Sequence, residues 1–122
     1  DYYDGGVTGK TGDIIEYVVE ATNSGDPLTS CAISDSIPTT YVSDLLAVYS
    51  SSGNLFYMPT LVVPEDAKTF VTGSNPAANQ ASYVAGNTPN LIVKVGAGAN
   101  NTSLGTIGTG EKVTIAYQVR IK

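Results

Sequence analysis

The chain has 122 residues, with 13 glycines, one cysteine and no histidine or tryptophan, and only 14% of its residues are charged. Without histidine there is no imidazole base, no Ser-His-Asp nucleophile system and no imidazole metal ligand. A single cysteine, Cys31, excludes an internal disulfide and a zinc site built from several cysteines. The composition therefore predicts a structural or binding module with no catalytic residues, no cofactor and no enzymatic activity.

The chain is acidic, with a net charge of −5 at pH 7 and only six lysines and arginines. Because a phosphate backbone is bound by a concentrated basic surface, we expect no nucleic-acid partner. No stretch approaches the roughly 18 apolar residues of a membrane-spanning helix, and no signal-peptide pattern is present. If the protein is secreted, we expect that its signal peptide is removed ahead of residue 1. The length leaves room for one domain.

The first predicted element is a β-strand over residues 13–22, where apolar side chains recur at every second position. This period of two is the pattern of a strand with one buried face. One face would carry Ile15, Tyr17, Val19 and Ala21. The turn residues 23–27, Asn-Ser-Gly-Asp-Pro, then break the strand.

Further strands are predicted over residues 28–37, 41–49, 54–63, 90–95 and 112–122. In the third predicted strand, 41–49, Leu46 and Val48 would point inward. The last strand has the clearest alternation, and its length makes it a candidate edge for pairing between subunits. Residues 64–68, Pro-Glu-Asp-Ala-Lys, are the one predicted helix, of one or two turns at most.

Short strands at this spacing, separated by turn residues and without crossover helices, are typical of an antiparallel β-sandwich. We therefore predict an all-β fold of about seven strands. Cys31 alternates with apolar neighbours and is expected to be a small core residue, not a reactive thiol.

Several short motifs occur in order along this chain. They are Gly12-Asp13, Asn23-Ser24-Gly25-Asp26-Pro27-Leu28-Thr29, Ser34-Asp35-Ser36-Ile37-Pro38, Val95-Gly96-Ala97-Gly98-Ala99 and Gly105-Thr106-Ile107-Gly108-Thr109-Gly110-Glu111. In this order, and with the strands between them, they resemble the DUF11 or conserved-repeat domain of bacterial and archaeal surface proteins. The resemblance covers most of residues 12–50 and 90–122.

This resemblance implies an immunoglobulin-like antiparallel β-sandwich over residues 12–122, displayed outside the cell or on its surface. Such domains are structural segments, usually strung in tandem as stalks, and the resemblance brings no catalytic or cofactor-binding residue with it. The expected location is therefore extracellular.

The N-terminal segment, residues 1–11, departs from the family pattern. Members usually begin with an alternating strand rich in Val, Ile and Thr, whereas this segment is rich in glycine and alternates little. One interpretation is a first strand that is frayed or differently placed. The other is that the sandwich lacks its first strand, and residues 1–11 are a donor strand that completes the next subunit, head to tail. Tyr2, Tyr3 and Val7 are the candidate anchors of this donor.

Two smaller sites are candidates. Glu65 and Asp66 lie where some relatives carry an acidic run that looks able to bind a hard cation. Calcium takes roughly six to eight oxygen ligands, so two adjacent acids are more typical of a solvated helix start, and we predict no metal site. Asn100 and Asn101 head two overlapping glycosylation sequons, for which unmodified loop polarity is the alternative.

These observations predict a non-enzymatic structural subunit of an extracellular filament or pilus, a homopolymer joined by donor-strand complementation. Two alternatives stay open. One is an adhesive or binding module for a sugar or another surface protein, although the eight tyrosines are dispersed and form no predicted sugar platform. The other is a passive spacer domain from a longer surface stalk protein.

Overall fold

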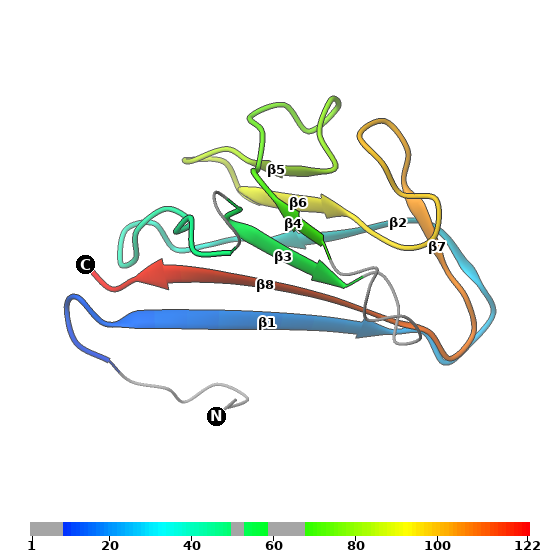
Figure 1. Ribbon diagram of the computed structural model, residues 1–122, viewed down its shortest axis with the longest axis horizontal. Coiled ribbons are helices and arrows are strands. Elements are labelled where there is room, and N and C mark those ends of the chain that lie inside the picture. Colours follow the sequence, from blue (N-terminus) through cyan, green and yellow to red (C-terminus); the bar gives the residue numbers. More distant parts are fainter. Residues whose placement is uncertain (1–8, 50–52, 59–67) are drawn as a thin grey trace.

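The computed structural model describes residues 9–49, 53–58 and 68–122. Within these ranges the protein is all-β, with eight strands and no helix (Figure 1). The strands are β1 (Ile14–Thr22), β2 (Leu28–Asp35), β3 (Leu55–Met58), β4 (Lys68–Phe70), β5 (Ala81–Tyr83), β6 (Leu91–Lys94), β7 (Gly105–Ile107) and β8 (Lys112–Arg120). Every pairing between these strands is antiparallel.

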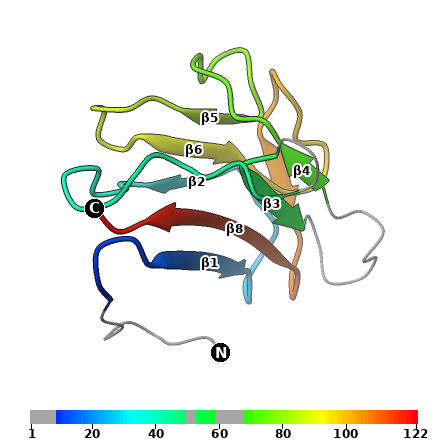
Figure 2. The same ribbon diagram turned by 60° about the vertical axis from the view of Figure 1, so that its left-hand side comes forward.

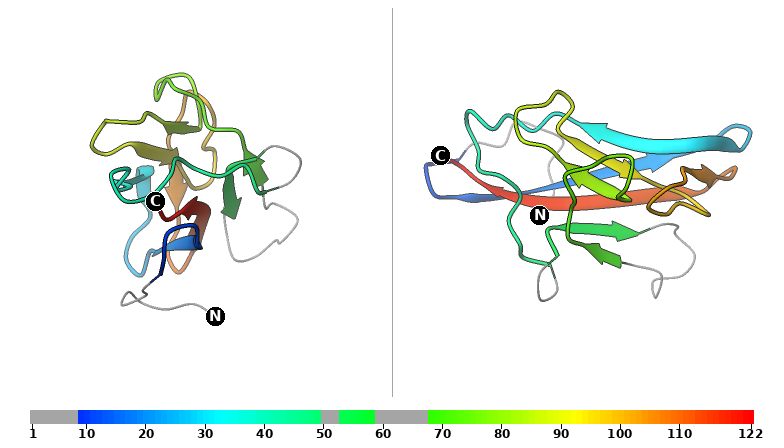
Figure 3. Two further views of the ribbon diagram at one scale, coloured as in Figure 1. Left: turned by 90° about the vertical axis from the view of Figure 1, so that its left-hand side faces the viewer. Right: turned by 90° about the horizontal axis from the view of Figure 1, so that it is seen from above.

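The strands form two four-stranded sheets, in the orders β1-β8-β3-β4 and β5-β6-β2-β7. β1 and β2 follow each other in sequence but belong to different sheets, so the turn at residues 23–27 carries the chain from one layer to the other (Figures 2 and 3). This architecture confirms the all-β antiparallel prediction and is consistent with a β-sandwich.

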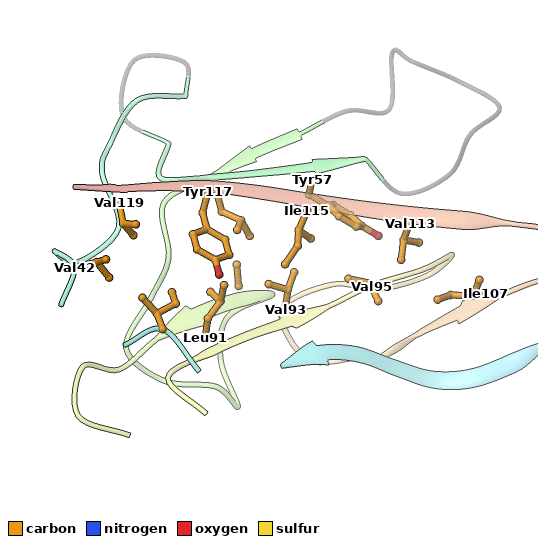
Figure 4. Packing of buried hydrophobic residues seen from close by; sticks show 13 residues of the cluster. Val42, Tyr57, Leu91, Val93, Val95, Ile107, Val113, Ile115, Tyr117 and Val119 are labelled. Atoms are coloured by element: carbon orange, nitrogen blue, oxygen red, sulfur yellow. The ribbon is translucent and has the colours of Figure 1, made fainter. Parts of the chain in front are cut away.

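The core lies between the two sheets and is built from faces of period two. β8 contributes four side chains of which none is more than 2% exposed: Val113, Ile115, Tyr117 and Val119. The row that faces them, on and just beyond β6, is Leu91, Val93 and Val95 (Figure 4). Because full burial of one such aliphatic side chain stabilises a fold by about 1.5–3 kcal/mol, these two rows supply much of the stability.

Buried tyrosine hydroxyls connect the two layers. Tyr117 of β8 donates a hydrogen bond to the carboxylate of Asp35 on β2, in the other sheet. Tyr57 of β3 accepts one at 2.8 Å from the Gly96 N–H, which follows β6. Burial raises the pKa of both phenols above their ordinary value, and the Asp35 carboxylate raises that of Tyr117 further. Each hydroxyl therefore stays protonated and fixes the distance between the sheets.

Four of the predicted strands are confirmed. The predictions over residues 13–22, 28–37, 90–95 and 112–122 correspond to β1, β2, β6 and β8, with ends that agree within two residues. The expected alternation is also found, because alternate residues of β6 and β8 form the buried rows of the core.

The prediction of a strand over residues 41–49 is wrong. This segment is a loop with isolated bridges, and it lies beside the end of β8, where the Ser43 N–H donates to the Arg120 carbonyl at 2.8 Å. Val42 is its buried residue, whereas Leu46 is only half-buried and Val48, expected inward, is 45% exposed. The path of residues 41–49 is determined by hydrogen bonds to β8. The alternation of apolar residues within the segment does not determine it.

The middle of the chain also differs from the prediction. Of the strand expected over residues 54–63, the structure places β3 at Leu55–Met58, and residues 59–63 lie outside the described residues. Of the helix expected over residues 64–68, only Lys68 is described, and it begins β4. β4, β5 and β7 lie where no strand was predicted, since each has three residues, too few for a period of two to be recognised.

The prediction that the last strand is a sheet edge is wrong as well. β8 is a central strand, paired with β1 along one side and with β3 along the other. The loop over residues 41–46 continues the β3 side toward the end of β8. An alternating pattern shows that one face of a strand is buried, but it carries no information on how many neighbours the strand has.

Replacing Tyr117 by phenylalanine removes the hydroxyl that bonds Asp35 and keeps the ring that stacks on Tyr17, with centroids 5.4 Å apart. Because the carboxylate then lacks its partner between the sheets, the free energy of unfolding should fall by about 1–3 kcal/mol, measured by urea denaturation. Tyr41→Phe is the matched control, since Tyr41 is 71% exposed. Equal losses in the two variants would contradict a connecting role for Tyr117.

The raised pKa of Tyr117 gives the sign of a pH dependence. In the unfolded chain the phenol ionises near pH 10, whereas in the fold it stays protonated to higher pH. Its contribution to stability is therefore fully present below about pH 10 and is lost as the pH rises above that value. Unfolding midpoints measured from pH 8 to 11.5 should fall more steeply for the wild type than for Tyr117→Phe, and parallel curves would contradict this.

Candidate functional site

β1 is the edge strand of its sheet. It has nine residues and pairs with β8 over all of them in one unbroken register, from Ile14 opposite Arg120 to Thr22 opposite Lys112. Among the residues that the structure describes, no strand pairs with its other side. We call that side the outer edge of β1; it runs along the lower margin of the molecule in Figure 1.

The hydrogen bonds at the two ends of the β1–β8 ladder determine which backbone groups face the outer edge. The Ile121 N–H donates to the Asp13 carbonyl at 2.8 Å, and the Asn23 N–H donates to the Glu111 carbonyl at 3.0 Å. Bonded positions recur at every second residue of an antiparallel pair, so the odd-numbered residues of β1 bond to β8. The backbone N–H and C=O groups of the even-numbered residues therefore point to the outer edge: Ile14, Glu16, Val18, Glu20 and Thr22.

The outer edge lacks the features that usually block pairing with another chain. β1 contains no proline, no lysine and no bulge. Its two carboxylates are engaged on the sheet face: Glu16 accepts bonds from Tyr49 at 2.7 Å and Gln118 at 2.8 Å, and Glu20 pairs with Lys112 at 3.4 Å. These acids are therefore directed to partners on the sheet face.

The other edge strands of the described structure are short or covered. β4 has three residues and begins with the charged Lys68. β5 also has three, and both the N–H and the C=O of Gly73 bond to it. β7 has three as well, and Thr106 in it exchanges two backbone bonds with Ala97. Among the described strands, β1 alone combines a long edge with no such protection.

The core-facing side chains of β1 are less covered than those of its neighbour. We call Ile15, Tyr17, Val19 and Ala21 the inward row of β1. None of the four is fully buried, and Tyr17 is 37% exposed, although three of them pack on the core and Tyr17 stacks on Tyr117. On β2, Cys31 and Ile33 are likewise only half-buried. Both strands therefore carry apolar side chains that are only partly covered.

A tight turn precedes β1. The Asp13 N–H donates to the Lys10 carbonyl at 3.0 Å, the Lys10 N–H donates to the Asp13 carboxylate at 2.9 Å, and Gly12 has a φ of +94°. The turn is held to the end of β8 by two hydrogen bonds. The Gly12 N–H donates to the Ile121 carbonyl at 2.8 Å, and the Thr11 hydroxyl donates to the Lys122 carbonyl at 3.0 Å. The turn is therefore fixed relative to the sheet.

The residues singled out from the sequence fall into two groups. The donor candidates Tyr2, Tyr3 and Val7 and the cation candidates Glu65 and Asp66 lie outside the described residues.

The sequon residues Asn100 and Asn101 are exposed, in the loop between β6 and β7. The Asn100 side-chain oxygen accepts bonds from the Thr102 N–H at 2.9 Å and the Ser103 N–H at 2.8 Å, and the Asn101 carbonyl accepts one from the Lys94 ammonium at 2.5 Å. The loop is thus ordered by its own polar contacts, and the use of either sequon stays a prediction.

Sequence reasoning missed the outer edge of β1 because it assigned the edge to β8. A usable signal was present, since the resemblance already indicated that a strand normally precedes Gly12-Asp13. Only the pairing of β1 with β8 shows which side of β1 that strand would occupy.

In the described ranges, no group of three or more Cys, Asp or Glu side chains is placed to hold a metal ion. Those ranges also contain no helix with the length and apolar character needed to cross a membrane. Comparison with known proteins gives no match to a family model, to a curated protein or to a solved structure.

Hydrogen exchange of the dilute monomer should show the alternation along β1. The amides of Glu16, Val18 and Glu20 face the outer edge and should exchange quickly, whereas those of Tyr17 and Val19 bond to β8 and should be protected at least tenfold more. Residue-resolved exchange by NMR measures this directly. Equal protection of both sets would mean that the outer edge is already paired in the monomer.

Proposed function

We propose that this protein is a non-enzymatic structural subunit of an extracellular filament or cell-surface assembly, with an immunoglobulin-like domain and subunits joined by β-strand addition. The observation that carries the proposal is the nine-residue outer edge of β1, unblocked and unpaired among the described residues. An exposed row of N–H and C=O groups is a template on which a strand of another chain can pair.

The energetics favour association at this edge. Five even-numbered residues of β1 present backbone groups outward, and each hydrogen bond formed there contributes about 0.5–1.5 kcal/mol net. An added strand would also cover part of the inward row of β1 and the half-buried Cys31 and Ile33, which adds apolar burial at about 25 cal/mol per Å². Main-chain bonds give the affinity, and the side chains of the added strand give the register.

The immunoglobulin-like identity and the surface location rest on the motifs that resemble the conserved-repeat domain. The two four-stranded antiparallel sheets agree with that interpretation. A structural role also fits the composition, since scarce charge and abundant glycine, asparagine and tyrosine suit strands and turns.

Val18→Pro tests the acceptor edge. The Val18 N–H points to the outer edge, so proline removes one outward donor while the bonds of the neighbouring odd-numbered residues to β8 stay. Val18→Ala is the matched control, because it removes the same side chain and keeps the N–H. We expect polymers of the wild type and of Val18→Ala in negative-stain micrographs and sedimentation profiles, and monomers of Val18→Pro.

Circular dichroism should show that Val18→Pro keeps a β spectrum with a cooperative thermal transition, so that loss of polymers is not loss of the fold. Polymers of Val18→Pro would contradict pairing at this edge. A wild type that stays monomeric at high concentration would overturn the proposed function and favour a spacer domain.

A further inference from the structure

Resting on the proposed function, we infer that the strand added to β1 is the N-terminal segment, residues 1–8, of a second copy of this chain, lying parallel to β1. The same geometry disfavours pairing of the segment with its own β1. This assignment specifies the occupant of the outer edge, its direction and the connectivity of the assembly.

The turn before β1 has the wrong geometry to return the chain along its own outer edge. The bond from the Asp13 N–H to the Lys10 carbonyl closes a four-residue turn in which Gly12 has a φ of +94° and Thr11 does not have a positive φ. This combination is a type II turn. Two-residue β-hairpins use types I′ and II′, because type II splays the two strands instead of matching their twist.

Gly9 shows where the chain lies just before this turn. A Cβ on Gly9 would stand 2.5 Å from the Cδ1 atom of Ile121, the residue that follows β8. β8 flanks β1 on the side opposite to the outer edge. The chain therefore reaches the turn close to the end of β8. To pair with its own β1, residues 1–8 would have to run along the outer edge, which lies on the other side of β1.

The direction of the added strand follows from the position of the chain ends. The Thr11 hydroxyl donates to the Lys122 carbonyl, so the chain enters β1 and leaves β8 at the same end of the molecule (Figure 1, left). A segment that leaves this end reaches the far end of β1 in the next subunit along the strand direction. It then runs in the same direction as that β1, with residue 8 near Thr22 and residue 1 near Ile14.

The segment has a suitable length and pattern. Eight extended residues span about 26 Å and the nine residues of β1 about 30 Å, so residues 1–8 can cover most of the outer edge. In an extended strand Tyr3, Gly5 and Val7 share one face. We assign this face to the core side, where it would cover the inward row of β1, and Tyr2 to the opposite face.

Disulfide trapping in the Cys31→Ser background tests direction and connectivity together. Parallel pairing between subunits places residue 7 near Ala21, whose side chain lies on the same core-side face, whereas a hairpin within one chain places residue 7 near Glu16; the two positions are about 17 Å apart along the strand. Cysteines can be bridged only when their Cα atoms are within about 7 Å. We therefore expect Val7→Cys/Ala21→Cys to form covalent ladders of chains on non-reducing gels, and Val7→Cys/Glu16→Cys to remain unlinked.

An intramolecular bridge in Val7→Cys/Glu16→Cys would overturn the inference in favour of pairing within one chain. An intermolecular bridge in that variant would overturn the parallel direction and indicate an exchanged antiparallel dimer. Absence of a bridge in both variants, with polymers still present in micrographs, would show that another segment fills the edge.

A second experiment separates this inference from the proposed function. Tyr3→Asp/Val7→Asp places charge on the core-side face of the segment, and Tyr2→Asp/Thr8→Asp adds the same charge to the opposite face as a matched control. We expect monomers of the first and polymers of the second. Polymers of Tyr3→Asp/Val7→Asp, with Val18→Pro monomeric, would overturn the donor assignment and leave strand addition at β1 intact.

Mixing the two defective proteins completes the test. Val18→Pro keeps a donor segment but has a blocked edge, and Tyr3→Asp/Val7→Asp keeps the edge but has a defective segment. Their mixture should give one-to-one heterodimers and no longer species by sedimentation velocity. If the mixture contains only monomers, residues 1–8 are not the strand that occupies β1.

Discussion

The long antiparallel ladder between β1 and β8 is the interaction on which the rest of the structure depends. It joins the chain just after its N-terminal turn to the last strand, over nine residue pairs in one register. β8 then packs its inward row against β6 and pairs with β3 on its other side, so both sheets are positioned by one central strand. Tyr117, near the middle of that strand, donates a hydrogen bond to Asp35 across the core, so β8 is joined to the other sheet by this bond as well as by apolar packing.

The same ladder leaves β1 with one satisfied side. Backbone polar groups in folded proteins are nearly always paired with protein or with water, and an edge strand keeps half of its groups for water. In the part of the chain that the structure describes, the remaining edges are short or covered, whereas β1 is long and regular. The inward row of β1 is also only partly buried, so this strand has incompletely covered apolar side chains as well as an unpaired edge. Incomplete pairing and incomplete burial occur on one strand, and the proposed function follows from this coincidence.

The turn at residues 23–27 was located correctly from the sequence because it depends on a few local atoms. The side chain of Asn23, for example, accepts a bond from the Gly25 N–H at 3.0 Å and donates to the Asp26 carbonyl at 2.8 Å, as an Asn-Ser-Gly sequence favours. The loop over residues 41–49 was misread, because its path depends on carbonyls of β8 that are some seventy residues away in the chain. The three-residue strands were missed because each is too short for an alternating pattern to be recognised.

By itself, the sequence determined the all-β fold class, the alternation of the long strands and the scarcity of chemistry-bearing side chains. All of these depend on composition and on a period of two, which are local properties. Only the tertiary structure decided that β8 is central and β1 is the edge, because strand order depends on which distant segments bond to each other. Likewise, the N-terminal glycines suggested a missing strand, but only the Lys10–Asp13 turn and the Gly9 contact with Ile121 indicate on which side of the sheet the chain arrives.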